Sequence, residues 1–249
     1  MEPALSTFDV PVQNLDPAHD GLVIAHLTDL HVGMLTPEKK IRRAVEMAND
    51  ASADLVVMTG DYVCYSKKFL PKMGECLAGL RARCGVVTTL GNHDHWMDAD
   101  GVSSQLRGNG YDVLRNQNVT LEANGRPLSV VGIDDAVTRH HDSARAFYGV
   151  NRGGTILTLT HCPELADTAA SHGAALIVAG HTHGGQIHMK GVTERVYRKI
   201  TKRRYLGGWY DVGNSALYVN RGVGQSSVPL RAGKGAQSEV AVFTLRRAG

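Results

Sequence analysis

The feature that most constrains the fold is a set of short apolar runs that alternate with amphipathic segments along the first 94 residues. The runs at 22–31, 54–61 and 85–94 indicate buried strands. Between them, residues 37–50 begin with a proline and show helical apolar spacing, which residues 66–82 repeat. Strand–helix–strand alternation is typical of βαβ units with parallel strands. We therefore predict an α/β fold.

The rest of the chain adds shorter elements. We expect short strands at 111–116, 119–123 and 128–135, a helix within 141–149, buried strands at 155–161 and 175–181 with a helix near 163–172 between them, and adjacent strands at 215–222 and 239–246. The 249 residues are 43% hydrophobic, and we find no repeat, low-complexity tract or domain linker. This length and composition predict a single domain over residues 1–249 with two β-sheets.

Five of the predicted strands end in residue types that bind metal ions. The side chains are Asp29, His31, Asp61, Asn92, His161, His181 and His183. Ligands of α/β sheets gather beyond the carboxyl ends of the strands. Alternation along an extended segment also points Asp29 and His31 to the same side, and likewise His181 and His183. We therefore expect these side chains to converge on one place.

The number and chemistry of these side chains indicate two metal ions. Seven nitrogen and oxygen donors are too many for one tetrahedral zinc ion, but they suit two divalent ions that share a carboxylate. Mixed imidazole and carboxylate ligation favours manganese, iron or zinc over calcium or magnesium. Two other interpretations stay open: structural turn and core polar residues, or a scaffold that no longer binds metal.

The order of the motifs "DLH", "GD", "GNHD", "H" and "GHTH" over residues 29–183 resembles the calcineurin-like metallophosphoesterase superfamily. The stretches "TDLHVG", "LTLTHCPE", "GHTHGGQI" and "YVNRGVGQSSVPLR" are similar to a bacterial phosphodiesterase branch related to UDP-2,3-diacylglucosamine diphosphatase. The resemblance implies a four-layer α/β/β/α sandwich, in which helices flank two mixed β-sheets. It also implies a dinuclear metal site at the carboxyl ends of the strands.

The resemblance assigns a role to each residue of the motifs. It implies a first metal site formed by Asp29, His31, Asp61 and His183, and a second formed by Asp61, Asn92, His161 and His181, with Asp61 as the bridge. It implies that His93 faces the scissile phosphate and that Asp94 orients the His93 imidazole. The expected reaction is hydrolysis of a phosphodiester or diphosphate bond by a hydroxide that bridges the two ions, with His93 assisting the leaving group.

Several functions remain open at this point. The substrate could be the UDP-2,3-diacylglucosamine of lipid A synthesis, a glycerophosphodiester or a cyclic nucleotide, and a non-catalytic interaction scaffold could share the fold. The basic residues form only one local cluster, which argues against a nuclease. The metallo-β-lactamase pattern HxHxDH does not match residues 181–186, and amidohydrolases carry HxH on their first strand, where this chain has Asp29 and His31.

The basic stretch at 190–208 and the residue after the "GNHD" motif are candidates for substrate contact. Arg203, Arg204 and Tyr205 could recognise phosphate or an anionic lipid headgroup, and apolar residues interleaved at 190–206 suit contact with a membrane surface. The other interpretation of this stretch is a solvated charged loop. His95 could line the pocket or serve only in packing.

Charge and cysteine content bear on the location. The net charge of +3 is ordinary, the N-terminal stretch lacks the features of a signal peptide, and no window approaches the ~20 apolar residues of a membrane span. The four cysteines form no CxxC pair, so we expect reduced thiols. We therefore expect a cytoplasmic protein, with any membrane contact at the inner face of the membrane.

Overall fold

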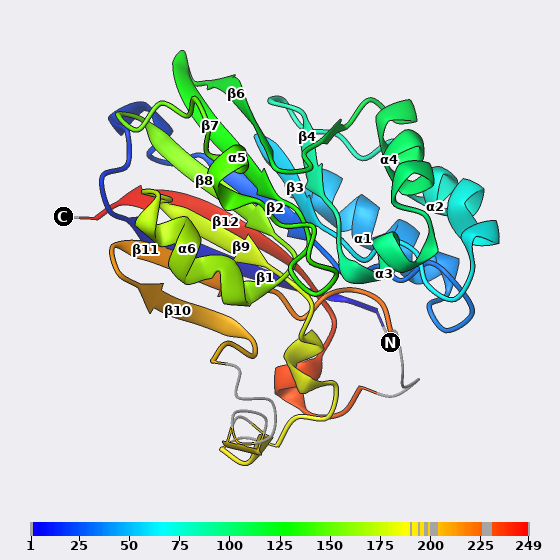
Figure 1. The fold of residues 1–249 in the computed structure, drawn as a ribbon. Helices are drawn as coiled ribbons and strands as arrows, with labels where there is room; N and C mark the ends of the chain where they lie inside the picture. The colour runs from blue at the N-terminus through cyan, green and yellow to red at the C-terminus, as the bar shows by residue number, and fades with distance from the viewer. Residues whose placement is uncertain are drawn as a thin grey trace.

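Two six-stranded sheets packed face to face form the centre of the molecule (Figure 1). The computed structural model describes residues 2–189, 191–193, 195–196, 199, 204–225 and 231–248. Among these residues, no helix is both long enough and apolar enough to cross a bilayer. The two sheets and the helices on their outer faces confirm the four-layer α/β/β/α sandwich that the sequence predicts.

The first sheet is mixed and has the strand order β1-β12-β2-β3-β4-β5. Its strands are β1 (Ala4–Val12), β12 (Glu239–Arg247), β2 (Val23–Leu27), β3 (Leu55–Thr59), β4 (Val86–Thr89) and β5 (Asp112–Val113). The strands β2, β3, β4 and β5 run parallel, β12 is antiparallel to β2, and β1 is parallel to β12. The carboxyl ends of β2, β3 and β4 therefore meet at one edge.

The second sheet is also mixed and has the order β10-β11-β9-β8-β7-β6. Its strands are β10 (Gly208–Val212), β11 (Ser215–Val219), β9 (Leu176–Ala179), β8 (Thr155–Thr160), β7 (Arg126–Ile133) and β6 (Gln117–Ala123). Four central strands run parallel, and β10 and β6 pair antiparallel at the two edges. The carboxyl ends of β8 and β9 lie next to each other as a result.

Helices cover the outer face of each sheet. The helices are α1 (Glu38–Asp50), α2 (Leu70–Leu77), α3 (Asn92–Met97), α4 (Ala99–Gly108), α5 (Ser143–Ala146) and α6 (Ala166–Ser171). Short 3-10 turns are η1 (Pro17–His19), η2 (Lys67–Phe69), η3 (Pro163–Leu165), η4 (His183–Gly185) and η5 (Lys234–Ala236). In Figure 1, α1, α2 and α4 lie on the side of the first sheet and α5 and α6 on the side of the second.

The layers are held by three apolar clusters. In α1, Ile41, Ala44, Val45 and Ala48 share one buried face, which packs with β2 and β3 residues in the first cluster. The second cluster lies between the sheets and includes side chains from β2, β3, β7, β8 and β9. The third joins α5 and α6 to the second sheet. Full burial of an aliphatic side chain contributes roughly 1.5–3 kcal/mol, so these clusters fix how the sheets pack on each other.

The structure corrects several predicted elements. The segments at 215–222 and 239–246 are strands, but they are not adjacent, since β11 belongs to the second sheet and β12 to the first. The helix predicted at 66–82 ends at Leu77, because Ala78 has a ψ of 133° and Gly79 a φ of +87°, neither of which continues a helix. The strand predicted at 85–94 ends at Thr89, and α3 begins at Asn92. Strands β1 and β10 were not predicted.

Candidate metal centre

The seven predicted ligands lie just beyond the carboxyl ends of five strands. Asp29 and His31 follow β2, Asp61 follows β3, and the first residue of α3, Asn92, follows β4. From the second sheet, His161 follows β8, and His181 and His183 follow β9. The two sheets thus bring together side chains that are up to 154 positions apart in the sequence, from residue 29 to residue 183. This is the edge at which α/β sheets bind ligands.

Left-handed backbone conformations in the loops, and not the alternation of side chains along a strand, place the candidate ligands at this edge. The φ angles of Asp29, His31, Asp61, His181 and His183 are 51°, 47°, 56°, 74° and 52°. Our reason for expecting paired side chains on extended strands was therefore wrong, because β2 already ends at Leu27 and β9 at Ala179. Non-glycine residues in rare backbone regions cost of order 1–3 kcal/mol each and cluster at functional sites.

The first group of ligands consists of Asp29, His31 and His183. The Nε2 atoms of the two histidines are 3.1 Å apart, and Asp29 Oδ1 lies 3.8 Å from His31 Nε2 and 3.4 Å from His183 Nε2. Oδ2 of Asp29 accepts hydrogen bonds from the Thr28 hydroxyl and the His181 amide. Oδ1 is buried and accepts none from the described residues. A buried carboxylate oxygen without a donor is the group that a cation would satisfy.

The second group consists of Asp61, His161 and His181, with Asn92 beside them. His161 Nε2 lies 3.3 Å from Asp61 Oδ2, 3.2 Å from Asn92 Oδ1 and 3.2 Å from His181 Nδ1. His161 Nδ1 donates to the carbonyl oxygen of Thr59, 2.8 Å away. A hydrogen bond of this kind holds the ring so that its other nitrogen faces the metal in histidine-ligated sites.

Asp61 lies between the two groups. Its Oδ2 atom is 3.6 Å from His31 Nε2 in the first group and 3.3 Å from His161 Nε2 in the second. Its Oδ1 atom accepts a hydrogen bond from the His93 amide, which fixes the orientation of the carboxylate. One carboxylate oxygen thus faces both groups of candidate ligands.

The charges of the two groups depend strongly on each other. Burial acts to raise the pKa of Asp29 and Asp61, but the neighbouring histidines hold both below their usual range. Burial opposes protonation of His31 and His161, yet the carboxylates raise the pKa of His31 to about 9 and of His161 to about 10. Without metal, protons on these histidines therefore balance the carboxylates. Binding of cations would release those protons.

Two glycines allow the loops to approach each other this closely. A Cβ atom on Gly91 would lie 2.3 Å from Asp61 Oδ1 and 2.9 Å from His161 Nδ1. A Cβ atom on Gly222 would lie 2.6 Å from Asp29 Cβ, and Gly222 also has a φ of +75°. Any side chain at either position would push a ligand away from its group.

The residues present fit a pair of divalent cations. Two buried carboxylates, four imidazoles and one amide oxygen surround the centre, and one carboxylate oxygen points inward without a donor among the described residues. Buried ionised carboxylates are costly unless a cation or hydrogen bonds compensate them. Imidazole, carboxylate and amide groups together suit manganese, iron or zinc.

His93 lies beside the first group, and its ring contacts Cys64 where Asp94 was the predicted partner. Its ring centroid is 4.8 Å from that of His31, and its Nδ1 atom is 3.3 Å from the sulfur of Cys64. The Asp94 carboxylate accepts hydrogen bonds from the amides of Asp61, Tyr62, Val63 and Gly91. The predicted role of Asp94 in orienting the His93 ring is therefore wrong: Asp94 ties the loop after β3 to the start of α3.

The four predicted substrate contacts have different outcomes. His95 Nε2 lies 2.7 Å from Asp134 Oδ1, and the His95 side chain is only 4% exposed. Tyr205 is 1% exposed, packs in the cluster under α6 and donates to Asp167, so it is a core residue. Arg204 is exposed and pairs with the same aspartate on α6. Arg203 lies outside the described residues.

Sequence reasoning missed two residues of the centre. Cys64 touches the His93 ring, and Nη2 of Arg231 lies 2.6 Å from Nδ1 of His183. Arg231 ends the stretch "YVNRGVGQSSVPLR", so that stretch contained the signal, but no role was assigned to the residue. For Cys64, the only signal was its position three residues after the "GD" motif.

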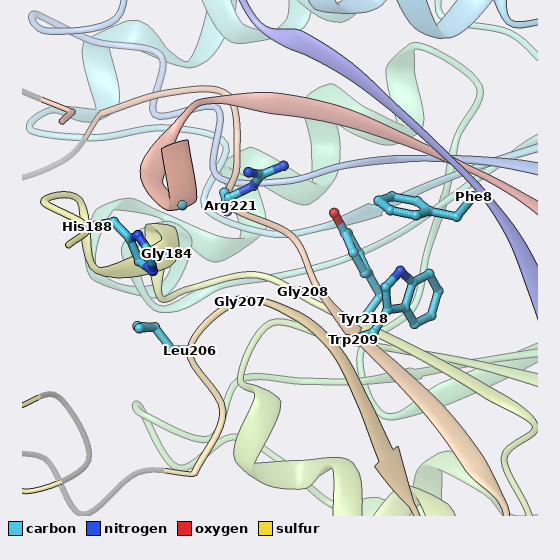
Figure 2. Close-up of a pocket in the computed structure, with 10 residues that line it drawn as sticks. Phe8, Gly184, His188, Leu206, Gly207, Gly208, Trp209, Tyr218 and Arg221 are labelled. Carbon is cyan, nitrogen blue, oxygen red and sulfur yellow. The ribbon is translucent and has the colours of Figure 1, made fainter. Parts of the chain in front are cut away.

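A cavity of about 220 Å³ is lined in part by Gly184, which follows His183 in the sequence (Figure 2). The rings of Phe8, Trp209 and Tyr218 lie together on one side of this cavity. Trp209 is T-shaped to Phe8, with ring centroids 5.5 Å apart. Arg221 also lines the cavity, and its guanidinium pairs with the buried Glu239 carboxylate. The cavity is therefore aromatic on one side and polar on another.

Curated relatives align along most of the chain. The Danio rerio "Transmembrane protein with metallophosphoesterase domain" is 27% identical over 99% of this chain and 58% of its own length. Two proteins of Bacillus subtilis (strain 168), the uncharacterized metallophosphoesterases YkoQ and YkuE, are 27% and 29% identical over 92% and 91% of this chain. The alignments cover 86% of YkoQ and 80% of YkuE, so this chain spans just over half of the first relative and most of the other two.

Two solved structures from Thermus thermophilus share the fold. A 5'-nucleotidase precursor aligns with a TM-score of 0.53 and 15% identity over 82% of this chain and 49% of that one. The protein TT1561 aligns with a TM-score of 0.55 and 12% identity over 81% of this chain and 89% of that one. The family model described as "Calcineurin-like phosphoesterase" matches residues 22–185, well over half of the chain. The protein therefore belongs to the calcineurin-like phosphoesterase family.

Proposed function

We propose that the protein hydrolyses phosphodiester or diphosphate bonds with the help of two divalent metal ions. The observation that carries this proposal is the place of Asp61, whose Oδ2 atom faces a histidine of each ligand group at 3.6 Å and 3.3 Å. One carboxylate between two sets of ligands is what a dinuclear centre requires. Manganese, iron and zinc are the candidate metals.

Each group of side chains has a separate task in this reaction. Asp29, His31, Asp61 and His183 would hold one ion, and Asp61, Asn92, His161 and His181 the other. When bound, the pair of ions supplies positive charge for the phosphate oxygens and a water molecule that is acidic enough to react near neutral pH. The left-handed loops and the glycines keep the side chains in place, so little reorganisation is needed during the reaction.

His93 acts on the leaving group in this proposal. Its ring centroid lies 4.8 Å from that of His31 in the first ligand group and 4.9 Å from that of the exposed Trp96. His93 would donate the proton on its outer nitrogen to the leaving oxygen as the P–O bond breaks. Proton transfer from a positioned side chain contributes typically 10²- to 10⁴-fold.

The metal content of the purified protein tests the dinuclear centre. We expect about two ions per chain by elemental analysis after purification without chelator, and loss of activity on dialysis against a chelator that added manganese restores. A chain that binds well under one ion and hydrolyses no aryl phosphodiester would be an interaction scaffold, and the proposal would be wrong.

A substrate panel separates the reactions that this centre permits. Matched monoesters, diesters and diphosphates of one alcohol, assayed with manganese, should give the highest kcat/KM for diesters or diphosphates. The cavity beside Gly184, with its three aromatic rings, is the candidate place for the group attached to phosphate. UDP-2,3-diacylglucosamine, a glycerophosphodiester and a cyclic nucleotide belong in the panel because the sequence resemblance favours this branch. A clear preference for monoesters would remove the diester assignment.

We also propose that residues 1–249 work as one domain, in the cytoplasm, with contact to a membrane surface through residues 190–206. The apolar core shared by the two sheets supports the single domain, and the four unpaired cysteines suit a reducing compartment. Val192 and Val196 are 49% and 47% exposed, which supports an interfacial segment. Sedimentation with anionic vesicles should be reduced by Val192→Ser with Val196→Ser, and unchanged sedimentation would exclude this contact.

A further inference from the structure

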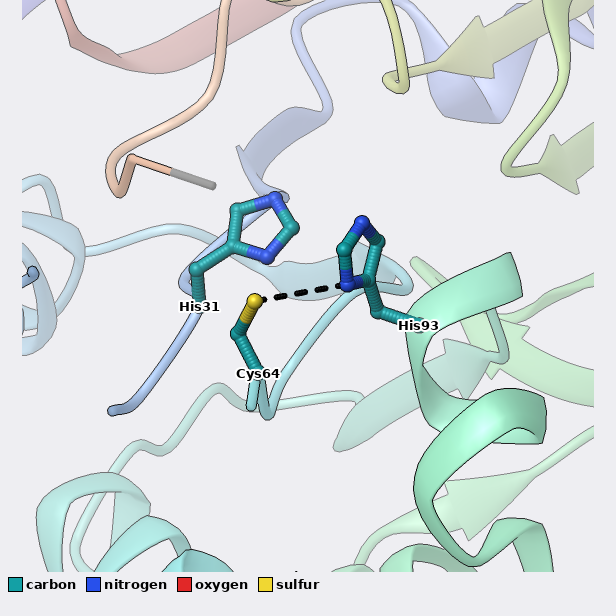
Figure 3. A group of neighbouring side chains, drawn as sticks. All are labelled: His31, Cys64 and His93. Carbon is teal, nitrogen blue, oxygen red and sulfur yellow. Dashed lines mark hydrogen bonds between the residues drawn. The ribbon is translucent and has the colours of Figure 1, made fainter. Parts of the chain in front are cut away.

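Cys64 lies between a proposed metal ligand and the proposed proton donor. It follows the "GD" motif in the loop after β3, where it is buried. Its sulfur is 3.3 Å from Nδ1 of His93. The sulfur, one ring nitrogen of His31 and one ring nitrogen of His93 all lie within 4.8 Å of one another (Figure 3). The two rings are nearly perpendicular, at 84°.

The His31 ring has one nitrogen to spare for this contact. Its Nε2 atom faces Asp29, Asp61 and His183 in the metal centre. Its Nδ1 atom is fully buried and has no hydrogen-bond partner within the part of the chain that the structure describes. Figure 3 shows the nitrogen nearest the ring attachment on the side of the Cys64 sulfur. A histidine that binds metal through Nε2 carries a hydrogen on Nδ1, and that hydrogen needs an acceptor.

We propose that the Cys64 thiol is a positioning residue that links His31 to His93 through hydrogen bonds. The sulfur accepts from Nδ1–H of His31 and shares one hydrogen with Nδ1 of His93. This inference rests on the proposed function, because it assigns His93 the role of proton donor. Its consequence is that Nε2 of His93 keeps a hydrogen of its own and presents it away from Cys64, where the leaving oxygen would lie.

The proton count supports this consequence. If the shared hydrogen is on sulfur, His93 is neutral and its hydrogen is on Nε2; as Nε2 gives that proton to the leaving oxygen, the sulfur hydrogen moves to Nδ1, which leaves a neutral ring and a thiolate. If the shared hydrogen moves to Nδ1, the ring is a cation that still carries a hydrogen on Nε2. Without the thiol, a neutral ring could place its single hydrogen on either nitrogen, and the fraction with Nε2–H would fall. Asp94 offers no substitute, because four backbone amides occupy its carboxylate.

Histidine ¹⁵N spectra of the metal-free protein test the positioning role without any turnover. In the wild type, the Nε2 atom of His93 should be protonated at neutral pH. In Cys64→Ala, the His93 signals should shift toward a mixture of the two neutral tautomers, and Cys64→Ser should restore much of the wild-type pattern, since a hydroxyl can also accept and donate. Cys84→Ala is the matched control, because the Cys84 thiol donates to the Glu122 carbonyl oxygen at 3.6 Å and neither residue belongs to the ligand loops.

Kinetics with two leaving groups test whether the positioning matters for proton donation. Cys64→Ala should lower kcat about 10- to 100-fold on a methyl phosphodiester, as loss of a group that orients a site residue typically does. It should have little effect on a 4-nitrophenyl phosphodiester, whose leaving group needs no proton. KM and metal content should stay near wild type. In a His93→Asn background, Cys64→Ala should cause no further loss.

The outcomes separate this inference from the proposed function. Wild-type protein that turns over neither ester with metal would overturn the proposed function, while the ¹⁵N spectra would still decide the tautomer. Active wild-type protein with an unchanged Cys64→Ala spectrum would overturn the role of Cys64. An equal loss on both esters together with lost metal would also overturn it, since the thiol would then support the metal centre and not His93.

Discussion

The two sheets contribute different chemistry to the same centre. The loops of the first sheet supply both carboxylates, the amide and one imidazole, whereas the loops of the second sheet supply imidazoles alone. Both carboxylates among the candidate ligands therefore come from one sheet, and three of the four imidazoles from the other. Neither sheet therefore forms the site by itself, and the packing between the two sheets sets the geometry of the site.

The sheets also hold each other's ligands in place. His161 of the second sheet donates to the carbonyl oxygen of Thr59, at the end of β3 in the first. The His181 amide donates to Asp29, and the Gly224 amide, beyond β11, donates to the Asp29 carbonyl oxygen at 2.6 Å. The charged ligands thus need the second sheet for their orientation, and the imidazoles need the first.

Removing charge from the first sheet should have the largest effect. Asp61→Asn keeps the oxygen that accepts from the His93 amide but removes the charge between the two groups. We expect a loss of more than about 10³-fold in kcat/KM and fewer than two ions per chain by elemental analysis. Asp100→Asn, at a side chain that is 92% exposed, is the matched control. Retention of two ions and of activity would mean that Asp61 is no bridge.

His93 also comes from the first sheet but is not a proposed metal ligand, so its replacement should have a different effect from that of Asp61. His93→Asn should lower kcat on an unactivated phosphodiester about 100- to 1,000-fold, while the metal content stays at the wild-type value. Steady-state kinetics and elemental analysis of the same preparation measure both. If the variant keeps full activity on that ester, His93 has no part in the reaction.

Removing an imidazole of the second sheet should cost less than removing a carboxylate. His181→Asn leaves the charge of the centre unchanged, so we expect the apparent metal affinity to fall about 10- to 100-fold. Excess manganese should then recover much of the activity, which a metal titration followed by activity would measure. If excess metal does not restore the activity, this imidazole matters as much as a carboxylate, and the proposed difference between the two sheets is wrong.

The smallest expected effect is on the stability of the folded protein in acid, and it comes from a buried histidine of the first sheet. Burial of His26 on β2 lowers its pKa to about 3, below the 6.5 of an unfolded chain, and Asn220 beyond β11 donates to the His26 carbonyl oxygen. Between these pH values the unfolded chain binds the extra proton, so this histidine lowers the free energy of unfolding as the pH falls through 6.5. From pH 7 to pH 5 the loss from this group is about 2 kcal/mol.

Denaturation of a variant isolates that contribution. His26→Gln should lose about 2 kcal/mol less than the wild type between pH 7 and pH 5 in urea unfolding, and His141→Gln, at an exposed position, should lose as much as the wild type. Identical pH dependence in His26→Gln would show that His26 is not held neutral in the folded protein.

Local sequence patterns predicted the ligand set and the parallel core, because each ligand stands directly beside an apolar strand. The same patterns could not predict the left-handed loops, since Asp29 and His31 fit an extended segment equally well. They missed β1 because its first six residues, as far as Asp9, are only partly buried or exposed, so its alternation lacks a strong apolar face. They also made Tyr205 a candidate for substrate contact, because the basic residues before it hide its contact with α6.

The placement of β12 between β1 and β2 has a consequence for synthesis of the chain. While a ribosome is still producing the middle of the protein, residues 4–12 have no neighbour to pair with, because their partner spans residues 239–247. Pairing along that edge must wait until residues 239–247 have emerged. A nascent chain would therefore expose an unpaired strand edge until then, and chaperones or early misassembly would act on it at this stage.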